Sequence, residues 1–192
     1  MLIPGYRALS SIRNLASNAQ PGLIYLFQGE RKILHLAAQE LINRFALQEH
    51  VQVIAGGNRV SFEQLPHLLG ERASEIYEVL DHISVSRAET CYQMLDALVA
   101  LKPGPVPLVI TDMLEPFYEE DLSVAEVGLL LKKCLISLKE LSFSAPILIS
   151  AEGDASRRGL LETLEQNSGM RFYLQPMQDA PQVLQVDLPG FC

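Results

Sequence analysis

Short, continuously apolar segments alternate with helix-patterned segments along most of this chain, and this alternation constrains the fold more than any other feature. The apolar segments include LIYLF (23–27), VQVIAGG (51–57), PLVITDM (107–113) and APILISAEG (145–153). Strands that lack polar alternation are typical of parallel sheets that are buried on both faces. We therefore predict an α/β protein with three layers, in which helices cover both faces of a mostly parallel sheet.

The segments between the apolar runs indicate where the helices lie. Residues 31–46 place apolar side chains on one broad face. Residues 124–142 are apolar on most sides, which predicts a well-buried helix. Shorter helices are predicted at 5–17 and 61–69. The segments MRFYLQP (170–176) and PQVLQVDLP (181–189) predict an antiparallel strand pair at one sheet edge. No linker is evident, so residues 1–192 are interpreted as a single domain.

Charge and hydropathy limit the classes of partner. The chain has 192 residues and a net charge of −8, which disfavours generic binding to a phosphate backbone. No apolar stretch reaches about 18 residues, so we expect no membrane span. The N-terminus lacks a basic start followed by an apolar run, so we expect no signal peptide.

The cysteines and histidines favour neither a disulfide framework nor a metal site. Cys91, Cys134 and Cys192 are odd in number and far apart, which indicates reduced thiols in a cytoplasmic protein. The four histidines lack metal-ligand spacing and are predicted to be surface or half-buried residues. They are His35, His50, His67 and His82.

The first strand is followed by a loop that occupies the place of a phosphate-binding loop. In open α/β sheets, ligands bind at the carboxyl ends of the strands. A working phosphate loop reads G-x-x-x-x-G-K-[ST], but here only Gly29 precedes Arg31 and Lys32, and Ile33 replaces the hydroxyl residue. The start of a helix with two basic residues can still attract an anion. The alternative is an ordinary turn with solvated charges.

Three other strand ends carry candidate residues. Asp112 follows PLVIT, where a P-loop enzyme holds Mg²⁺, and Ser150 follows PILI, where it could sense a phosphate. The alternative interpretation is structural: Asp112 caps the following turn, and Ser150 starts a loop. Gly56 and Gly57 end the second strand and permit a close chain reversal, but supply no general base.

The basic residues that could contact DNA lie mostly toward the C-terminal end. Residues 103–131 contain no Lys, Arg or His but several carboxylates, so this segment would repel DNA. Arg157, Arg158 and Arg171 are the weak candidates for DNA contact. An arginine pair is also an ordinary solvated helix start.

The order of these motifs resembles the ATPase core of the RecA-like recombinase superfamily, of the strand-exchange type of archaea and eukaryotes and their paralogues. IPGYRALSSI and PGLIYLFQG are similar to the family's lead-in to its first strand, and PLVITDMLEPFYEEDLSVAEV is similar to its Walker B strand and first DNA-binding loop. The segments EIYEVLDHISVSRAET, APILISAEG and LLETLEQNSGMRFYLQP match in order and spacing. The resemblance covers nearly the whole chain and implies a P-loop NTPase-like fold.

The departures from the family pattern concern catalysis. The Walker A loop is short and lacks its Ser or Thr, and Gly56 or Gly57 stands where the family usually carries a catalytic glutamate. The segment that corresponds to the family's first DNA loop is acidic, the one that corresponds to the second is short, and we expect no N-terminal helical module. Asp112 alone remains of the ATPase set, and one carboxylate cannot perform phosphoryl transfer.

Three hypotheses follow. The first is a non-catalytic RecA-like domain, a pseudo-ATPase that needs no cofactor and binds a protein partner or itself, as an accessory in DNA recombination or repair. The second is an ATPase with an atypical loop, in which Arg31, Lys32 and Asp112 handle ATP and Mg²⁺ with help from a neighbouring subunit. An open hollow at residues 28–32 would favour it, and a hollow filled by Gln28 or Glu30 would not.

The third hypothesis is direct DNA binding without nucleotide. It requires a basic face that gathers the scattered arginines, and the net charge of −8 speaks against it. The arginines in question are Arg59, Arg72, Arg87, Arg157, Arg158 and Arg171.

Overall fold

The computed structural model describes residues 12, 14–57, 73–118, 122–153, 158–175 and 182–186. The predicted helix at 61–69 lies outside these residues, as does most of the one at 5–17. The elements in chain order are β1 (Ile24–Gly29), α2 (Arg31–Ala46), β2 (Val51–Gly56), α4 (Ala73–Asp81), β3 (Ile83–Ala88), α5 (Cys91–Ala100), β4 (Leu108–Thr111), η1 (Glu115–Phe117), α6 (Val124–Ser142), β5 (Ile147–Ala151), α7 (Arg158–Gln166), β6 (Met170–Gln175) and β7 (Gln182–Val186).

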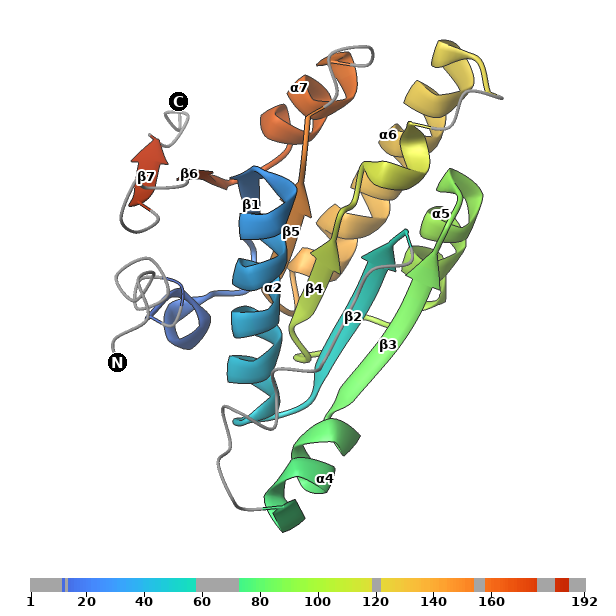
Figure 1. Ribbon diagram of the computed structural model, residues 1–192. Coiled ribbons are helices and arrows are strands. Elements are labelled where there is room, and N and C mark those ends of the chain that lie inside the picture. Colours follow the sequence, from blue (N-terminus) through green and yellow to red (C-terminus); the bar gives the residue numbers. More distant parts are fainter. Residues whose placement is uncertain are drawn as a thin grey trace.

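The strands form one sheet in the order β3-β2-β4-β5-β1-β6-β7 (Figure 1). All neighbouring pairs from β3 to β6 are parallel, and β7 runs antiparallel beside β6. The prediction of an α/β protein with a mostly parallel sheet is therefore confirmed. Parallel strands end at the same edge, so the loops after β4, β5 and β1 are adjacent there.

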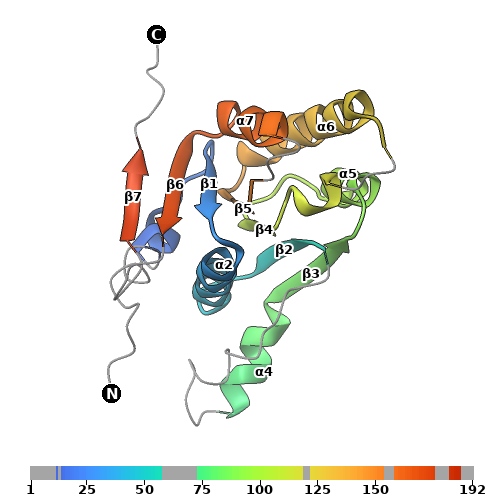
Figure 2. The same ribbon diagram turned by 45° about the horizontal axis from the view of Figure 1, so that its top comes forward.

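Helices cover both faces of the sheet, as Figure 2 shows from the edge where the parallel strands end. Strand β1 divides its side chains between the two layers. Tyr25 and Phe27 pack with α2, whereas Ile24 and Leu26 pack in a core that includes α5, α6 and α7. Each layer is therefore a separate apolar core, and β1 is buried on both sides, as the sequence predicts.

Capping boxes set the starts of α5 and α6. The Thr90 side chain accepts a hydrogen bond from the backbone N–H of Gln93, and Ser123 accepts one from Glu126. The Gln93 and Glu126 side chains accept from the backbone N–H of Thr90 and Ser123 in return. These reciprocal bonds satisfy backbone donors that a helix start leaves free. Helix α2 starts differently, because its N-cap residue Glu30 makes no side-chain capping bond.

Helix α6 is buried on one side only, so the prediction of a helix buried on most sides was wrong for its outer face. Leu129 and Ile136 are 56% and 60% exposed, and Phe143, directly after the helix, is 70% exposed. These residues lie seven positions apart, which places them on one stripe of the helix. An outer-layer helix meets the sheet with one face, and an apolar composition alone does not reveal that the other face stays open.

Candidate functional site

The structure brings Arg31, Asp112 and Ser150 together at the carboxyl edge of the sheet. Strand β5 lies between β1 and β4. Arg31 starts the helix after β1, Asp112 follows β4, and Ser150 lies near the end of β5. All three residues therefore lie at the sheet edge where ligands bind in open α/β sheets.

Asp112 is held in a sharp turn by its neighbours. It is the one non-glycine residue of the described chain with a positive φ, at 48°, in the left-handed region that aspartate tolerates better than most residues. Its backbone N–H donates to Ser150 Oγ at 3.0 Å. The carboxylate is buried, and its Oδ2 lies 2.5 Å from His35 Nε2. Its Oδ1 is buried without a hydrogen-bond partner within the described residues.

Arg31 bridges two carboxylates from different loops. Its Nη2 lies 2.5 Å from Glu115 Oε2, and its Nε donates to Glu152 Oε2 at 2.9 Å. Burial alone would lower the pKa of Arg31, but the charges of Glu115, Glu152 and Asp112 outweigh burial and raise it. The Tyr118 hydroxyl donates to the Glu152 carbonyl at 2.7 Å and joins the same two loops. Arg31 thus ties the start of α2 to the loops that follow β4 and β5.

Two glycines are required by close backbone contacts rather than by a phosphate. A Cβ at Gly29 would lie 2.3 Å from the Leu174 carbonyl oxygen on β6. A Cβ at Gly56 would lie 2.1 Å from the Asp112 carbonyl oxygen. Gly29, a predicted nucleotide-binding residue, therefore serves the packing of β1 against β6, and Gly56 cannot carry the side chain of a catalytic base.

The residues present do not fit a nucleotide-bound Mg²⁺. P-loop enzymes hold this ion between the loop Ser or Thr and the Walker B aspartate. Here Ile33 provides no hydroxyl, and the Asp112 carboxylate contacts His35 directly. Among the residues that the structure describes, no three His, Cys, Asp or Glu side chains are arranged to hold a metal ion. Lys32 is exposed on the first turn of α2.

A second polar cluster lies where β1 and β6 face α7. Gln28 is buried and donates from Nε2 to Glu165 Oε1 at 2.7 Å, and the Tyr173 hydroxyl lies 3.4 Å from the same oxygen. Burial and the charge of Glu165 raise the pKa of Tyr173. Gln28 thus turns toward α7. The atypical-loop hypothesis would be disfavoured by a hollow filled by Gln28 or Glu30, and the structure directs the Gln28 amide to Glu165.

The candidate DNA contacts are not gathered into one basic face by the described residues. Arg171 lies on β6 with its Nη1 3.8 Å from Glu165 Oε2. Arg158 is the first residue of α7, and its side chain lies outside the described part of the structure, as does all of Arg157. Arg87 is exposed on the outermost strand β3, whereas Arg59 and Arg72 fall outside the described ranges.

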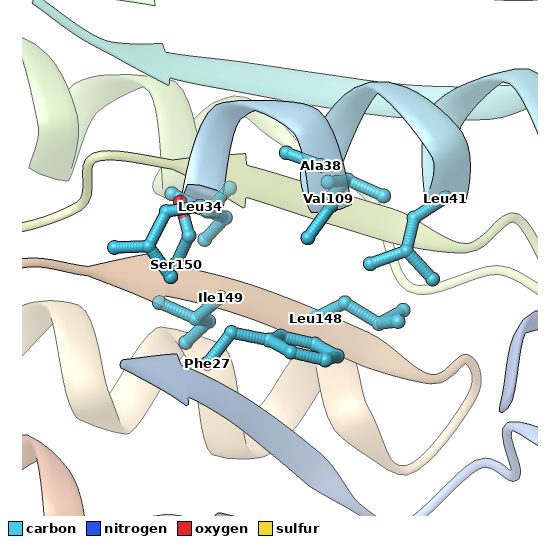
Figure 3. Close-up of a pocket in the computed structure, with 10 residues that line it drawn as sticks. Phe27, Leu34, Ala38, Leu41, Val109, Leu148, Ile149 and Ser150 are labelled. Atoms are coloured by element: carbon cyan, nitrogen blue, oxygen red, sulfur yellow. The ribbon is translucent and has the colours of Figure 1, made fainter. Parts of the chain in front are cut away.

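Arg31, His35, Asp112, Glu115, Glu152 and Ser150 are together called the strand-end cluster. A small apolar cavity lies beneath α2, below this cluster (Figure 3). Its volume is about 10 Å³, and its walls include Phe27, Leu34, Leu41 and Leu148. Ser150 contributes at its rim, as Figure 3 shows. A space of this size holds at most one water molecule. It is therefore a packing gap between helix and sheet rather than a ligand pocket.

The chain matches no protein-family model, and a comparison with curated proteins finds no match. Within the described residues, no helix combines the length and apolarity that crossing a membrane requires. The class defined by fold and site is thus an α/β protein with a strand-end cluster of charged side chains that bind one another.

Sequence reasoning missed three members of this cluster. His35 is half-buried, as predicted, but its contact with Asp112 was not foreseen, and neither Glu115 nor Glu152 was named as a site residue. One signal was available for His35. It follows Arg31 by four positions, so both lie on one face of α2 and point toward the same loops.

Proposed function

We propose that this chain is a non-catalytic RecA-like domain that acts by binding a protein partner or a second copy of itself. The observation that carries the proposal is the internal pairing of the groups that a phosphate loop would need. Arg31 is bound by Glu115 and Glu152, and Asp112 is bound by His35. Phosphoryl transfer requires a positioned polyphosphate, a metal and an oriented water together, and both Arg31 and Asp112 are already engaged by other side chains.

Electrostatics supports the same conclusion. A nucleoside triphosphate at the start of α2 would approach Asp112, Glu115 and Glu152, and Arg31 offsets only part of the negative charge of these three carboxylates. Repulsion between like charges in a partly buried site is costly because solvent screens it weakly. With a single glycine, the loop does not direct several backbone N–H groups at a phosphate, so no such hydrogen bonds offset the repulsion.

The outer face of α6 supports a binding role. Leu129, Ile136 and Phe143 form an exposed apolar stripe at seven-residue intervals, a pattern that helices use to pack against other helices. Lys132, Lys133 and Glu140 flank the stripe and are exposed. By analogy with the family that the sequence resembles, we propose that such a partner acts in DNA recombination or repair. The buried thiols agree with a cytoplasmic location.

Nucleotide binding tests the proposal directly. Calorimetric titration of the purified protein with ATP and Mg²⁺ is expected to give no binding heat up to millimolar nucleotide. The same titration is made on Lys32→Ala and Asp112→Ala, with circular dichroism to verify that each variant is folded. Binding by the wild-type protein that both substitutions abolish would overturn the proposal and establish the atypical-loop ATPase instead.

A further inference from the structure

The outer face of α6 is open along about four turns of helix. The helix has 19 residues and lies on the outside of its layer, next to α5 (Figure 2). Leu129, Ile136 and Phe143, here called the α6 stripe, are each more than half exposed. Large apolar side chains that are exposed in a row, rather than singly, are typical of an interaction surface. At about 1.5 Å per residue, the stripe is about 21 Å long, which suits packing along a second helix.

Lysines border the α6 stripe on both sides. A helical repeat of about 3.6 residues places Lys132 and Lys139 on one side of the stripe. It places Lys133 and Glu140 on the other side. All four are exposed, and within the described residues none of the three lysines forms an ion pair. With three lysines and one glutamate, this face has a net charge of +2, although the whole chain has −8.

Charge and shape decide what can cover this face. A twofold axis brings identical surfaces together, so in a pair of copies a face of net charge +2 would meet another of the same charge. Helices that lie on lipid present a broad apolar face, whereas this stripe is one residue wide. Apolar residues at seven-residue intervals form the narrow seam along which two helices pack. The face therefore fits a helix that is apolar on one side and acidic beside its seam.

We propose that the α6 stripe is the docking surface for an amphipathic helix of a partner protein, whose apolar seam is bordered by aspartate and glutamate. The inference rests on the proposed function and names the chemistry of the partner. Apolar side chains of the partner helix cover the stripe, and its carboxylates lie opposite Lys132 and Lys139, the side of the stripe without a carboxylate of its own. The negative charge of the rest of the chain opposes binding of the same helix elsewhere.

A peptide-binding assay tests the apolar part of this surface. The probe is a fluorescein-labelled peptide of three heptads, with leucine at positions a and d and glutamate at positions e and g. Fluorescence anisotropy is expected to detect its binding to the wild-type protein. Ile136→Asp is expected to weaken binding at least about tenfold, because apolar burial is lost at the centre of the stripe. The matched control is Leu36→Asp, at an exposed leucine of α2 on the opposite face of the sheet, and is expected to stay within about twofold of wild type.

A second peptide with lysine at positions e and g tests the charges. The wild type is expected to bind the glutamate peptide more tightly, despite its net charge of −8. Lys132→Glu with Lys139→Glu is expected to reverse this preference. The matched control, Lys32→Glu with Arg87→Glu, makes the same change in net charge at exposed residues of α2 and β3 and is expected to retain the preference. Circular dichroism verifies folding, and Lys139→Glu alone replaces the double variant if the latter is not folded.

Several outcomes would overturn the docking surface. They are no binding of the glutamate peptide by the wild type, a wild-type preference for the lysine peptide, and equal effects of a variant and its matched control. Sedimentation velocity and co-sedimentation with phosphatidylserine vesicles address the other occupants. A wild-type dimer, or vesicle binding, that Ile136→Asp abolishes would replace the partner helix with a second copy or a lipid surface. ATP binding in the nucleotide titration would overturn the non-catalytic assignment without changing any of these results.

Discussion

At the scale of single residues, the contact between Gly56 and Asp112 determines the shape of the site. The Asp112 carbonyl passes so close to Gly56 that a Cβ there would lie 2.1 Å from its oxygen. The same aspartate adopts a positive φ and receives support from Ser150. The end of β2 and the turn after β4 can therefore approach this closely only because residue 56 is a glycine.

Replacing Gly56 with alanine is expected to destabilise the fold by about 2–4 kcal/mol, because the added methyl group must displace backbone. Urea denaturation measures this loss in the free energy of unfolding. The matched control is Gly128→Ala in α6, where an added Cβ meets nothing within 4 Å. Alanine is the better helix former there, so a gain of about 0.5–1 kcal/mol is expected. Equal stability of the two variants would contradict the close contact.

At the scale of elements, the helix starts differ in how firmly they are specified. Ser123 and Glu126 form a capping box on α6, whereas Glu30 makes no side-chain capping bond on α2. Ser123→Ala is expected to lower the free energy of unfolding by about 1 kcal/mol at neutral pH. Glu30→Ala is expected to change it by less than about 0.5 kcal/mol. Urea denaturation distinguishes the two, and a larger loss for Glu30→Ala would contradict this assignment.

The effect of Ser123→Ala is also expected to depend on pH. Hydrogen bonds from Ser123 lower the pKa of Glu126 below its usual value of 4.5. A lowered pKa in the folded state contributes stability above the unfolded pKa, and this contribution is lost as the pH falls through the folded pKa. The stability difference between wild type and Ser123→Ala should therefore shrink below about pH 4. A difference that is constant from pH 7 to pH 3 would contradict the role of the Glu126 carboxylate.

The elements were largely predictable from sequence because their signals are local. Continuous apolar runs located β1, β2, β4 and β5 within a residue or two, and the glycine-ended strands indicated where loops begin. Strand-end reasoning also placed Arg31 near Asp112. The contacts that define the site were not predictable, since Arg31 meets Glu115 and Glu152 across 84 and 121 positions of sequence. Nothing local to Glu115 or Glu152 marks it as a partner of Arg31.

At the scale of the whole molecule, the two buried cysteines report on the layer formed by α5 and α6. Cys91 and Cys134 lie in the core between these helices and the sheet. Burial, with a smaller effect from Cys91, raises the pKa of the Cys134 thiol to about 12. The thiolate is the reactive form, so native Cys134 should be nearly inert at neutral pH.

Alkylation by iodoacetamide, followed by peptide mass spectrometry, tests this expectation. Labelling of Cys134 is expected to be slow in buffer and to rise with urea in parallel with global unfolding, because exposure requires loss of the core. The assay uses Cys192→Ser, since Cys192 lies outside the described residues. A labelling rate that does not depend on urea would indicate that the α5–α6 layer opens independently of the rest of the fold.

The Arg31 bridge has a consequence for how such a chain can change over generations. Ile33→Ser would restore a hydroxyl to the loop but leave Glu115 and Glu152 facing the incoming phosphates. Removing either carboxylate first would leave Arg31 half-paired before any ligand is gained. Under the proposed function, each single step back toward nucleotide binding therefore lowers fitness or gains nothing. Under that same proposal, the ion pairs of Arg31 mean that nucleotide binding would require at least two changes made together, one in the loop and one among the carboxylates.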